Sequence, residues 1–107
     1  PLTELITIKP QMIHSSLDQT LKNLILNNRL ATDSRQVQPD DVFIAISCAN
    51  VNSHIQQALE AGTKAIILEE KDQGDWQNRY PLVQFIVVPN ARYTLAQIAK
   101  ALYNDQP

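Results

Sequence analysis

The sequence predicts an α/β domain with a short, mostly parallel sheet, arranged in two layers or in three. Three short apolar runs, at residues 41–46, 65–68 and 85–88, are rich in β-branched side chains and do not alternate with polar residues. Such continuous runs are typical of strands that are covered on both faces, as in parallel sheets. Segments with the apolar spacing of amphipathic helices lie around these runs. Strands and helices mixed in this way favour an α/β layer structure.

The first helix is predicted from residue 16 to residue 27. Ser16 and Gln19 stand three positions apart, as the two members of a capping box do at a helix start. Residues 1–15 are only weakly patterned, so we expect them to be a loosely ordered lead-in. The apolar residues of the helix recur at helical spacing, and they are Leu17, Leu21, Leu24 and Ile25.

A second helix is predicted after the strand at residues 41–46, which itself follows the turn signal of Pro39 and Asp40. Asn52 or Ser53 is the expected N-cap of this helix. Its expected end is a glycine, which takes the left-handed conformation easily, at Gly62. The apolar residues of the helix are Ile55, Ala58 and Leu59.

The last helix follows the strand at residues 85–88, with Asn90 as its predicted N-cap. Polar residues at 104–107 close it. The polar stretch at residues 69–80, between the last two strands, is assigned no regular element. The apolar stripe of the last helix consists of Leu95, Ile98, Ala99 and Leu102.

Length and composition indicate a single globular domain over residues 1–107, with 44% hydrophobic and 19% charged residues. Nine basic and eleven acidic residues give a net charge of -2, without a cluster of Lys and Arg, which argues against nucleic acid as a partner. No apolar run approaches the about 20 residues that span a bilayer, and no signal-like segment opens the chain. We therefore expect a cytoplasmic protein without a membrane span. Nothing in the sequence fixes the oligomeric state, and we expect a monomer.

The sequence gives little support for a metal site, a disulfide or a phosphate-binding loop. Cys48 is the only cysteine, and His14 and His54 are scattered, so we predict neither a disulfide nor a metal site. We interpret Cys48 as a small buried apolar residue rather than as a nucleophile with a histidine partner. The only glycines, Gly62 and Gly74, do not lie in a loop of the kind that cradles phosphates.

Two pairs of adjacent carboxylates are Asp40 with Asp41 and Glu69 with Glu70. In extended structure neighbouring side chains point to opposite faces, which does not suit shared acid and base chemistry. We therefore expect these four side chains to lie at the solvated surface.

Asp33, Ser34 and Arg35 place an acid, a hydroxyl and a guanidinium group just before a turn and a buried strand. In one interpretation Ser34 donates to a phosphate or uracil oxygen, while Arg35 pairs with a phosphate or a carboxylate. In the other, Asp33 holds the turn by an Asx-type hydrogen bond and Arg35 bridges to Asp41 on the surface. The local chemistry by itself favours the second interpretation.

The longer segment at residues 33–45 resembles the opening motif of the Mur ligases, which reads Asp-Ser-Arg, a short spacer and then Pro-Gly-Asp-Leu-Phe-x-Ala. Residues 57–67 resemble the next helix and strand of that family, and residues 88–107 resemble the end of its first domain. This ordered set is more specific than any one of its elements. The matching residues of the opening motif are Asp33, Ser34, Arg35, Val37, Pro39, Asp41, Val42, Phe43, Ile44 and Ala45.

The resemblance implies a three-domain cytoplasmic enzyme of peptidoglycan synthesis. The first domain of such an enzyme holds the UDP end of UDP-N-acetylmuramoyl-dipeptide, the central domain binds ATP and magnesium, and the last domain delivers the amino acid. ATP phosphorylates the carboxylate of the precursor, and an amine attacks the acyl phosphate. This chain would then be the UDP-binding domain, with no catalytic residue, no cofactor of its own and no activity without its central and C-terminal domains.

Within the family, the ending at residues 103–107 most resembles the branch that adds the third amino acid to UDP-N-acetylmuramoyl-L-alanyl-D-glutamate. The branch that adds the D-alanyl-D-alanine unit is the nearest competitor. Whether 2,6-diaminopimelate, L-lysine or another amine is added stays open, because the resemblance assigns that choice to the last domain.

The resemblance also implies a substrate-binding set. Thr32 and Ser34 match positions that contact the uridine part of the ligand. Ala49, Asn50 and Val51 match the loop that lines the nucleotide, and much of that contact can come from backbone groups.

The sequence departs from the family pattern at three places. Asp40 stands where the family has glycine, and this costs little because aspartate tolerates a left-handed turn. Cys48 replaces a glycine after the strand and adds a Cβ near the expected diphosphate. Asn52 and Ser53 replace an Asp-Gly pair. We interpret these changes as a rearranged grip on UDP that uses the side chains of Asn50 and Asn52.

A function of another class stays open, namely a small α/β interaction module without a ligand. The scarcity of glycine and the absence of a catalytic constellation motivate it. The downstream reading frame separates the two hypotheses. A Gly-Lys-Thr loop shortly after Pro107 favours the ligase, whereas a stop codon there favours the module.

Overall fold

The computed structural model describes residues 19–104, and the side chains of residues 19–101. Helices and strands follow one another along the chain, which is the order of an α/β domain. The bounds of the elements are α2 Gln19–Asn27, β1 Leu30–Ala31, η2 Ser34–Gln36, β2 Val42–Ile44, α3 Val51–Glu60, β3 Ala65–Glu69, η3 Glu70–Asp72, α4 Trp76–Arg79, β4 Gln84–Val88 and α5 Ala91–Asn104, where η marks a 3-10 helix.

The four strands form one sheet in the order β1, β2, β3, β4, and every pair is parallel. Leu30 lies opposite Val42, and Phe43 of β2 lies opposite Ile66 of β3. Ile66 in turn lies opposite Phe85 of β4. The predicted, mostly parallel sheet is therefore confirmed, and it is parallel throughout. Because all strands run the same way, their carboxyl ends share one edge of the sheet.

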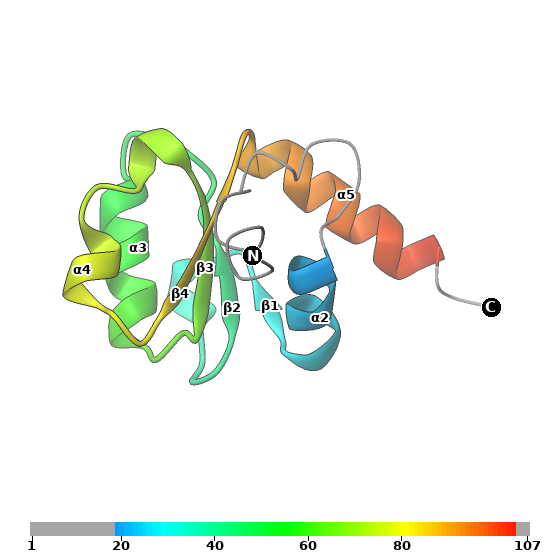
Figure 1. Cartoon of the computed structure of the whole chain (residues 1–107), viewed down its shortest axis with the longest axis horizontal. Coiled ribbons are helices and arrows are strands. Elements are labelled where there is room, and N and C mark those ends of the chain that lie inside the picture. Colours follow the sequence, from blue (N-terminus) through cyan, green and yellow to red (C-terminus); the bar gives the residue numbers. More distant parts are fainter. Residues whose placement is uncertain (1–18, 105–107) are drawn as a thin grey trace, which may run out of the picture.

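Helices cover both faces of the sheet, so the domain has three layers rather than two (Figure 1). α3 and α4 lie on one face, and α2 and α5 lie on the other. Successive strand residues point to opposite faces and enter two separate cores. The core under α3 contains Phe43, Ala45, Ile55, Ala58, Leu59, Ile66, Leu68 and Trp76, among others. The core under α2 and α5 contains Leu21, Ile25, Val42, Ile44, Ala65, Ile67, Val88, Ala91 and Ile98.

The two flanking helices bury the apolar faces that the sequence predicts. Leu21 of α2 and Ile98 of α5 are fully buried. The end of α2 agrees with the prediction, whereas the capping box at residues 16–19 begins outside the described residues. The lead-in predicted at residues 1–15 and the side chain of Leu102 also lie outside them.

β1 is a strand that the sequence analysis missed. Leu30 and Ala31 pair with β2, but two residues are too few to show a periodic pattern. β2 is shorter than predicted, with three residues. Its parallel pairing nevertheless continues, because the Ala45 N–H donates to the Ile67 carbonyl at 2.8 Å. Asp41 was predicted within this strand and instead precedes it.

α3 begins earlier than predicted. Its first residue is Val51, and Asn50 occupies the N-cap position without a capping side-chain hydrogen bond, so the predicted N-caps Asn52 and Ser53 are wrong. Val51 is 5% exposed and packs in the core under α3. Burial of this apolar side chain favours the earlier start, since tertiary packing supplies most helix stability in proteins. The predicted apolar face is confirmed, with Ile55, Ala58 and Leu59 buried.

The turn before β2 and the end of α3 meet through two residues in the left-handed conformation. Asp40 has a φ of 71° and Gly62 a φ of 97°, and Asp40 is the only non-glycine residue with a positive φ between residues 19 and 104. The Asp40 N–H donates to the Gly62 carbonyl at 2.9 Å. Both expectations, a left-handed Asp40 and a helix end at Gly62, are confirmed.

Replacement of Gly62 by alanine is expected to lower the free energy of unfolding by about 1 to 2 kcal/mol. A φ of 97° is strained for any residue with a Cβ, and the new Cβ would lie 3.3 Å from the Pro39 Cα. Urea unfolding of the variant measures the change. Gly74→Ala is the matched control, because a Cβ there meets nothing within 4 Å at a φ of 49°. Equal losses would contradict the role given to the approach of Pro39.

β4 forms an edge of the sheet and is covered less completely than β3. Its central residues Phe85, Ile86 and Val87 are only partly buried, whereas the first four residues of β3 are buried. The expectation of strands covered on both faces is confirmed for β3 and also for β4. Phe85 and Val87 pack against the core under α3, and Ile86 and Val88 lie at the core on the other face. The segment before β4 folds into η3 and α4, with Trp76 only 7% exposed.

The start of α5 is fixed by two side chains. Asn90 is the N-cap as predicted, and its Oδ1 accepts a hydrogen bond from the Tyr93 N–H at 2.8 Å. Glu69, at the end of β3, accepts one from the Ala91 N–H at 2.9 Å. These contacts tie the helix to the carboxyl edge of the sheet. Of the helices between residues 19 and 104, none has the length and apolar character needed to cross a membrane.

Candidate functional site

The predicted site residues follow two neighbouring strands at the carboxyl edge of the sheet. Thr32 comes directly after β1, while Ala49 and Asn50 lie between β2 and α3. In open parallel sheets, ligands bind in crevices outside the carboxyl ends of the strands. The fold therefore brings both parts of the predicted set to the edge where such domains bind ligands.

Asp33, Ser34 and Arg35 form a compact turn after β1. The Asp33 carboxylate caps η2 by accepting the Arg35 N–H at 2.9 Å, which confirms the predicted Asx-type turn. The Arg35 guanidinium donates two hydrogen bonds to the same carboxylate, from Nε at 3.1 Å and from Nη2 at 2.9 Å. These hydrogen bonds lower the pKa of Asp33 to about 2. Arg35 is thus held by Asp33, and the predicted bridge from Arg35 to Asp41 is wrong.

The partner of Asp41 is Arg29, in the loop before β1. Arg29 donates from Nη2 to Oδ2 at 2.6 Å and from Nε to Oδ1 at 3.1 Å, and the Gln38 N–H donates to Oδ2 at 2.8 Å. The Asp41 residue is 4% exposed, so the expectation of a solvated carboxylate is wrong here. The hydrogen bond from Arg29 lowers the pKa of Asp41 below its ordinary value. This ion pair lies at the amino end of β2, away from the site.

A polar hollow of about 530 Å³ opens between the turn and α3, and we call it the Ser34 hollow. Ser34 is 5% exposed, and its Oγ donates to Oε1 of Gln57 at 2.7 Å. This hydrogen bond holds the turn against the helix. Thr32 is exposed at the same place. The hollow is lined by Thr32, Asp33, Ser34, Arg35, His54 and Gln57.

His54 and Gln57 line the Ser34 hollow and were not among the predicted site residues. They stand three positions apart on α3, so their side chains share one face of the helix. That spacing was visible in the sequence, but nothing there shows which face of the helix meets the turn. The surroundings of Cys48 were also misjudged, because Cys48 is exposed instead of buried. Its Sγ lies 3.9 Å from Nδ1 of His54.

The three residues predicted from the nucleotide-lining loop have different surroundings. Ala49 and Asn50 are exposed next to the start of α3. The side chain of Val51 is buried in the core, and its N–H donates to the Cys48 carbonyl at 3.2 Å. None of the three lines the Ser34 hollow itself. Their loop reaches the hollow through Cys48, which contacts His54.

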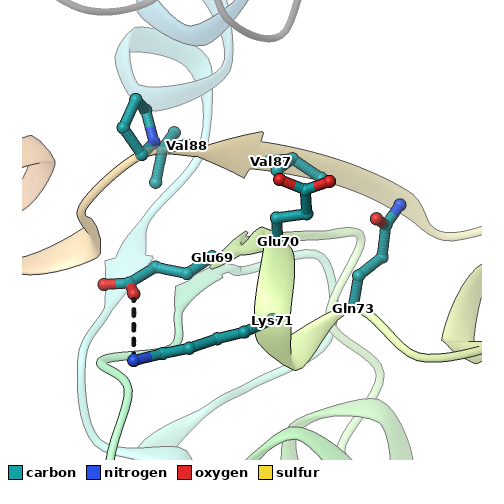
Figure 2. A pocket seen from close by; sticks show the side chains of 7 residues that line it. Glu69, Glu70, Lys71, Gln73, Val87 and Val88 are labelled. Carbon is teal, nitrogen blue, oxygen red and sulfur yellow. Dashed lines mark ion pairs between the residues drawn. The ribbon is translucent and has the colours of Figure 1, made fainter.

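A second hollow, of about 520 Å³, lies at the carboxyl ends of β3 and β4 (Figure 2). Figure 2 shows Lys71 reaching toward Glu69, with Glu70 pointing away from that pair. The Lys71 Nζ lies 3.8 Å from Oε1 of Glu69, whose other oxygen caps α5. Glu69 and Lys71 of this hollow therefore already have partners, since Glu69 pairs with Lys71 and links β3 to the start of α5.

Between residues 19 and 104, no three His, Cys, Asp or Glu side chains gather as a metal site needs. Gly62 ends a helix and Gly74 lies in the turn before α4, so neither belongs to a phosphate-cradling loop after a strand. The chemistry that this chain offers is hydrogen bonding and charge at the carboxyl edge.

Comparison with curated proteins shows which family the chain is similar to. The chain is 41% identical over 73 residues, or 66% of its length, to a UDP-N-acetylmuramyl-tripeptide synthetase of Roseiflexus. It is 32% identical over 101 residues, or 83% of its length, to a UDP-N-acetylmuramoyl-L-alanyl-D-glutamate--2,6-diaminopimelate ligase of Clostridium tetani. A ligase of the same name from Pseudomonas putida is 34% identical over 96 residues, or 86% of the chain.

The chain belongs to the Mur ligase family. It resembles the N-terminal domain of that family, as its opening motif predicted. No family model matches the chain. The chain spans only 14% to 20% of the length of these Mur ligase relatives. The motif that first indicated the family runs from the Ser34 turn into the buried strand β2.

Proposed function

We propose that this chain is the UDP-binding domain of a cytoplasmic, ATP-dependent Mur ligase. The full enzyme would add the third amino acid, 2,6-diaminopimelate or L-lysine, to UDP-N-acetylmuramoyl-L-alanyl-D-glutamate in peptidoglycan synthesis. The chain would hold the UDP end, while its own central domain would bind ATP and magnesium and its C-terminal domain would deliver the amino acid. We further propose that the protein works as a monomer.

The observation that carries this proposal is the Ser34 hollow. Its volume of about 530 Å³ lies in the range of small-molecule pockets, about 300 to 1,000 Å³. It combines hydroxyl, amide and imidazole groups with the guanidinium of Arg35, whose side chain is 77% exposed. Because Asp33 uses Nε and Nη2 of Arg35, the third nitrogen, Nη1, stays available to a diphosphate.

Within this proposal, Thr32 and Ser34 contact the uridine, and the loop of Ala49, Asn50 and Val51 lines the nucleotide. Ala49 and Asn50 offer backbone groups and one amide side chain at the surface. Val51 contributes through its position at the first turn of α3, since its side chain is buried. In this proposal the ligand contacts both the loop at residues 49–51 and the residues that line the Ser34 hollow.

Titration with UDP-N-acetylmuramoyl-L-alanyl-D-glutamate tests this proposal. Amide signals of the 107-residue chain near Thr32, Ser34 and Ala49 are expected to shift at millimolar ligand, because one domain of three binds weakly by itself. Ser34→Ala is expected to weaken binding about tenfold, the effect of about one lost hydrogen bond. Ser53→Ala makes the same change on an exposed residue outside the hollow and is the control.

If the amide signals of Ser34 and of residues 49–51 do not shift during the titration, these residues are not the binding site. That result would favour the alternative of a non-catalytic interaction module. The downstream reading frame gives an independent test, because a Gly-Lys-Thr loop shortly after Pro107 would favour the ligase. The D-alanyl-D-alanine-adding ligase remains the alternative within the family, and product analysis of the full enzyme distinguishes it.

A further inference from the structure

We propose that Gln57 is the positioning and specificity residue of the Ser34 hollow, which it adapts to the imide edge of a uracil base. This inference rests on the proposed function, because it assumes that the hollow receives the base of a nucleotide. The sequence analysis interpreted Ser34 as a donor to the ligand. The hydrogen bond between Ser34 and Gln57 reverses that role.

The Ser34 hydroxyl has a single proton to donate. Oγ donates this proton to Oε1 of Gln57 at 2.7 Å, a distance typical of a well-formed O–H···O hydrogen bond. A hydroxyl has one donor and two acceptor lone pairs. Because its one proton already forms the hydrogen bond to Gln57, the Ser34 hydroxyl can only accept a hydrogen bond from a ligand. Ser34 is 5% exposed, so the surrounding protein restricts its rotation to other partners.

The amide of Gln57 supplies the complementary function. Its Oε1 is engaged by Ser34, and no residue between 19 and 104 accepts a hydrogen bond from its Nε2. Gln57 lines the hollow and is exposed, so this NH2 group can donate to a ligand. The hollow thus presents an acceptor, Ser34 Oγ, beside a donor, Gln57 Nε2, on two groups that share one hydrogen bond.

An acceptor beside a donor matches a ligand edge with a donor beside an acceptor. The imide edge of uracil has this pattern, since its N3–H donates and the adjacent carbonyl accepts. Cytosine presents the opposite pattern, with an accepting N3 beside a donating amino group. A site built on hydrogen bonds rejects a mismatched analogue strongly, because its polar groups are left unpaired. Gln57 would therefore make the hollow select UDP over CDP.

The test compares UDP, CDP and 3-methyl-UDP as ligands of the 107-residue chain, with dissociation constants from amide shift titrations. We expect UDP to bind about tenfold or more tightly than either analogue, since CDP mismatches both groups and 3-methyl-UDP lacks the N3–H. Gln57→Glu keeps an acceptor for the Ser34 proton but loses the donor. The ratio of UDP to CDP affinity should then fall to about threefold or less.

The ratio is the decisive readout, because the added charge of Gln57→Glu weakens both diphosphates alike. Gln38→Glu is the matched control, since Gln38 is exposed at the amino end of β2, and its ratio should equal that of the wild type. A dispersed amide spectrum shows that each variant is folded. The wild-type comparison needs no variant and keeps the inference testable if Gln57→Glu fails to fold.

The outcomes separate this inference from the function on which it rests. If the wild type binds UDP but binds CDP or 3-methyl-UDP within about twofold, Gln57 does not select the imide edge and the inference is overturned alone. An unchanged ratio in Gln57→Glu also overturns it. If the wild type binds no UDP at all, the proposed function fails first and the inference fails with it.

Discussion

Replacement of Phe43 by alanine is expected to lower the free energy of unfolding by about 4 kcal/mol. Phe43 is 2% exposed in the middle of β2 and packs in the core under α3. Its ring is the largest fully buried side chain of the described residues. Truncation removes apolar contacts and leaves a cavity that the strands on either side cannot fill. Such a loss is a large fraction of the stability of a small domain.

Urea unfolding followed by circular dichroism measures this effect through the shift of the midpoint. Phe43→Leu keeps most of the volume and is expected to cost only about 1 kcal/mol. Leu82→Ala is the surface control, because Leu82 is 98% exposed and should change stability by less than about 0.5 kcal/mol. A loss below about 1 kcal/mol for Phe43→Ala would show that the core is not packed around this ring.

Replacement of Asp41 by asparagine is expected to cost about 2 kcal/mol. The Asp41 carboxylate accepts three hydrogen bonds, two from Arg29 and one from the Gln38 N–H. Asparagine offers one acceptor oxygen and turns an NH2 group toward these donors. The estimate stays below that for a fully buried ion pair, because the Arg29 side chain is 52% exposed and regains water. Chemical unfolding at neutral pH checks the value.

Asp40→Asn is the matched control for this change. It removes the same charge from the neighbouring residue, which is exposed, and asparagine also tolerates the left-handed φ of 71°. We expect it to alter stability by less than about 0.5 kcal/mol. Equal losses in the two variants would mean that net charge, and not the Arg29 contact, explains the effect.

The Asp41→Asn variant is also expected to change the pH dependence of stability. The pKa of Asp41 is lowered in the folded state, so its ion pair stabilises the protein fully above the unfolded pKa of about 3.9. That contribution is lost as the pH falls through the folded pKa. The difference in unfolding free energy between wild type and Asp41→Asn should therefore shrink below about pH 4. A difference that stays constant down to pH 2 would contradict this role for Asp41.

Both variants concern the motif that first indicated the family. Asp41 and Phe43 belong to it, yet neither lies in the Ser34 hollow. Buried strand residues and turns follow directly from local patterns of hydrophobicity and turn formation, whereas the burial of Asp41 does not. This explains why β2, β3, α3 and the cap of α5 could be predicted from the sequence. It also explains why the family could be identified before any site geometry.

The lining of the Ser34 hollow was predicted only in part. Thr32 and Ser34, which precede the motif or lie within it, line the hollow, and the Asx-type turn at Asp33 is a local structure. His54 and Gln57 were missed, although they line the same hollow. They lie more than 20 positions from Thr32 and Ser34 respectively, and contacts over such separations leave no periodic signal. The partner of Arg35 was misjudged for another reason, because the sequence does not show which of two nearby carboxylates, Asp33 or Asp41, the guanidinium contacts.

The sequence by itself determined the three-layer or two-layer α/β class, the family and the turn that carries Ser34, because each depends on short-range patterns. Only the tertiary structure decided that the sheet carries helices on both faces and that Asp41 is buried against Arg29. It also decided that the Ser34 hydroxyl donates a hydrogen bond to Oε1 of Gln57. Crossover connections bring the turn after β1 against α3, and we propose that this juxtaposition makes Ser34 an acceptor for the ligand instead of the predicted donor.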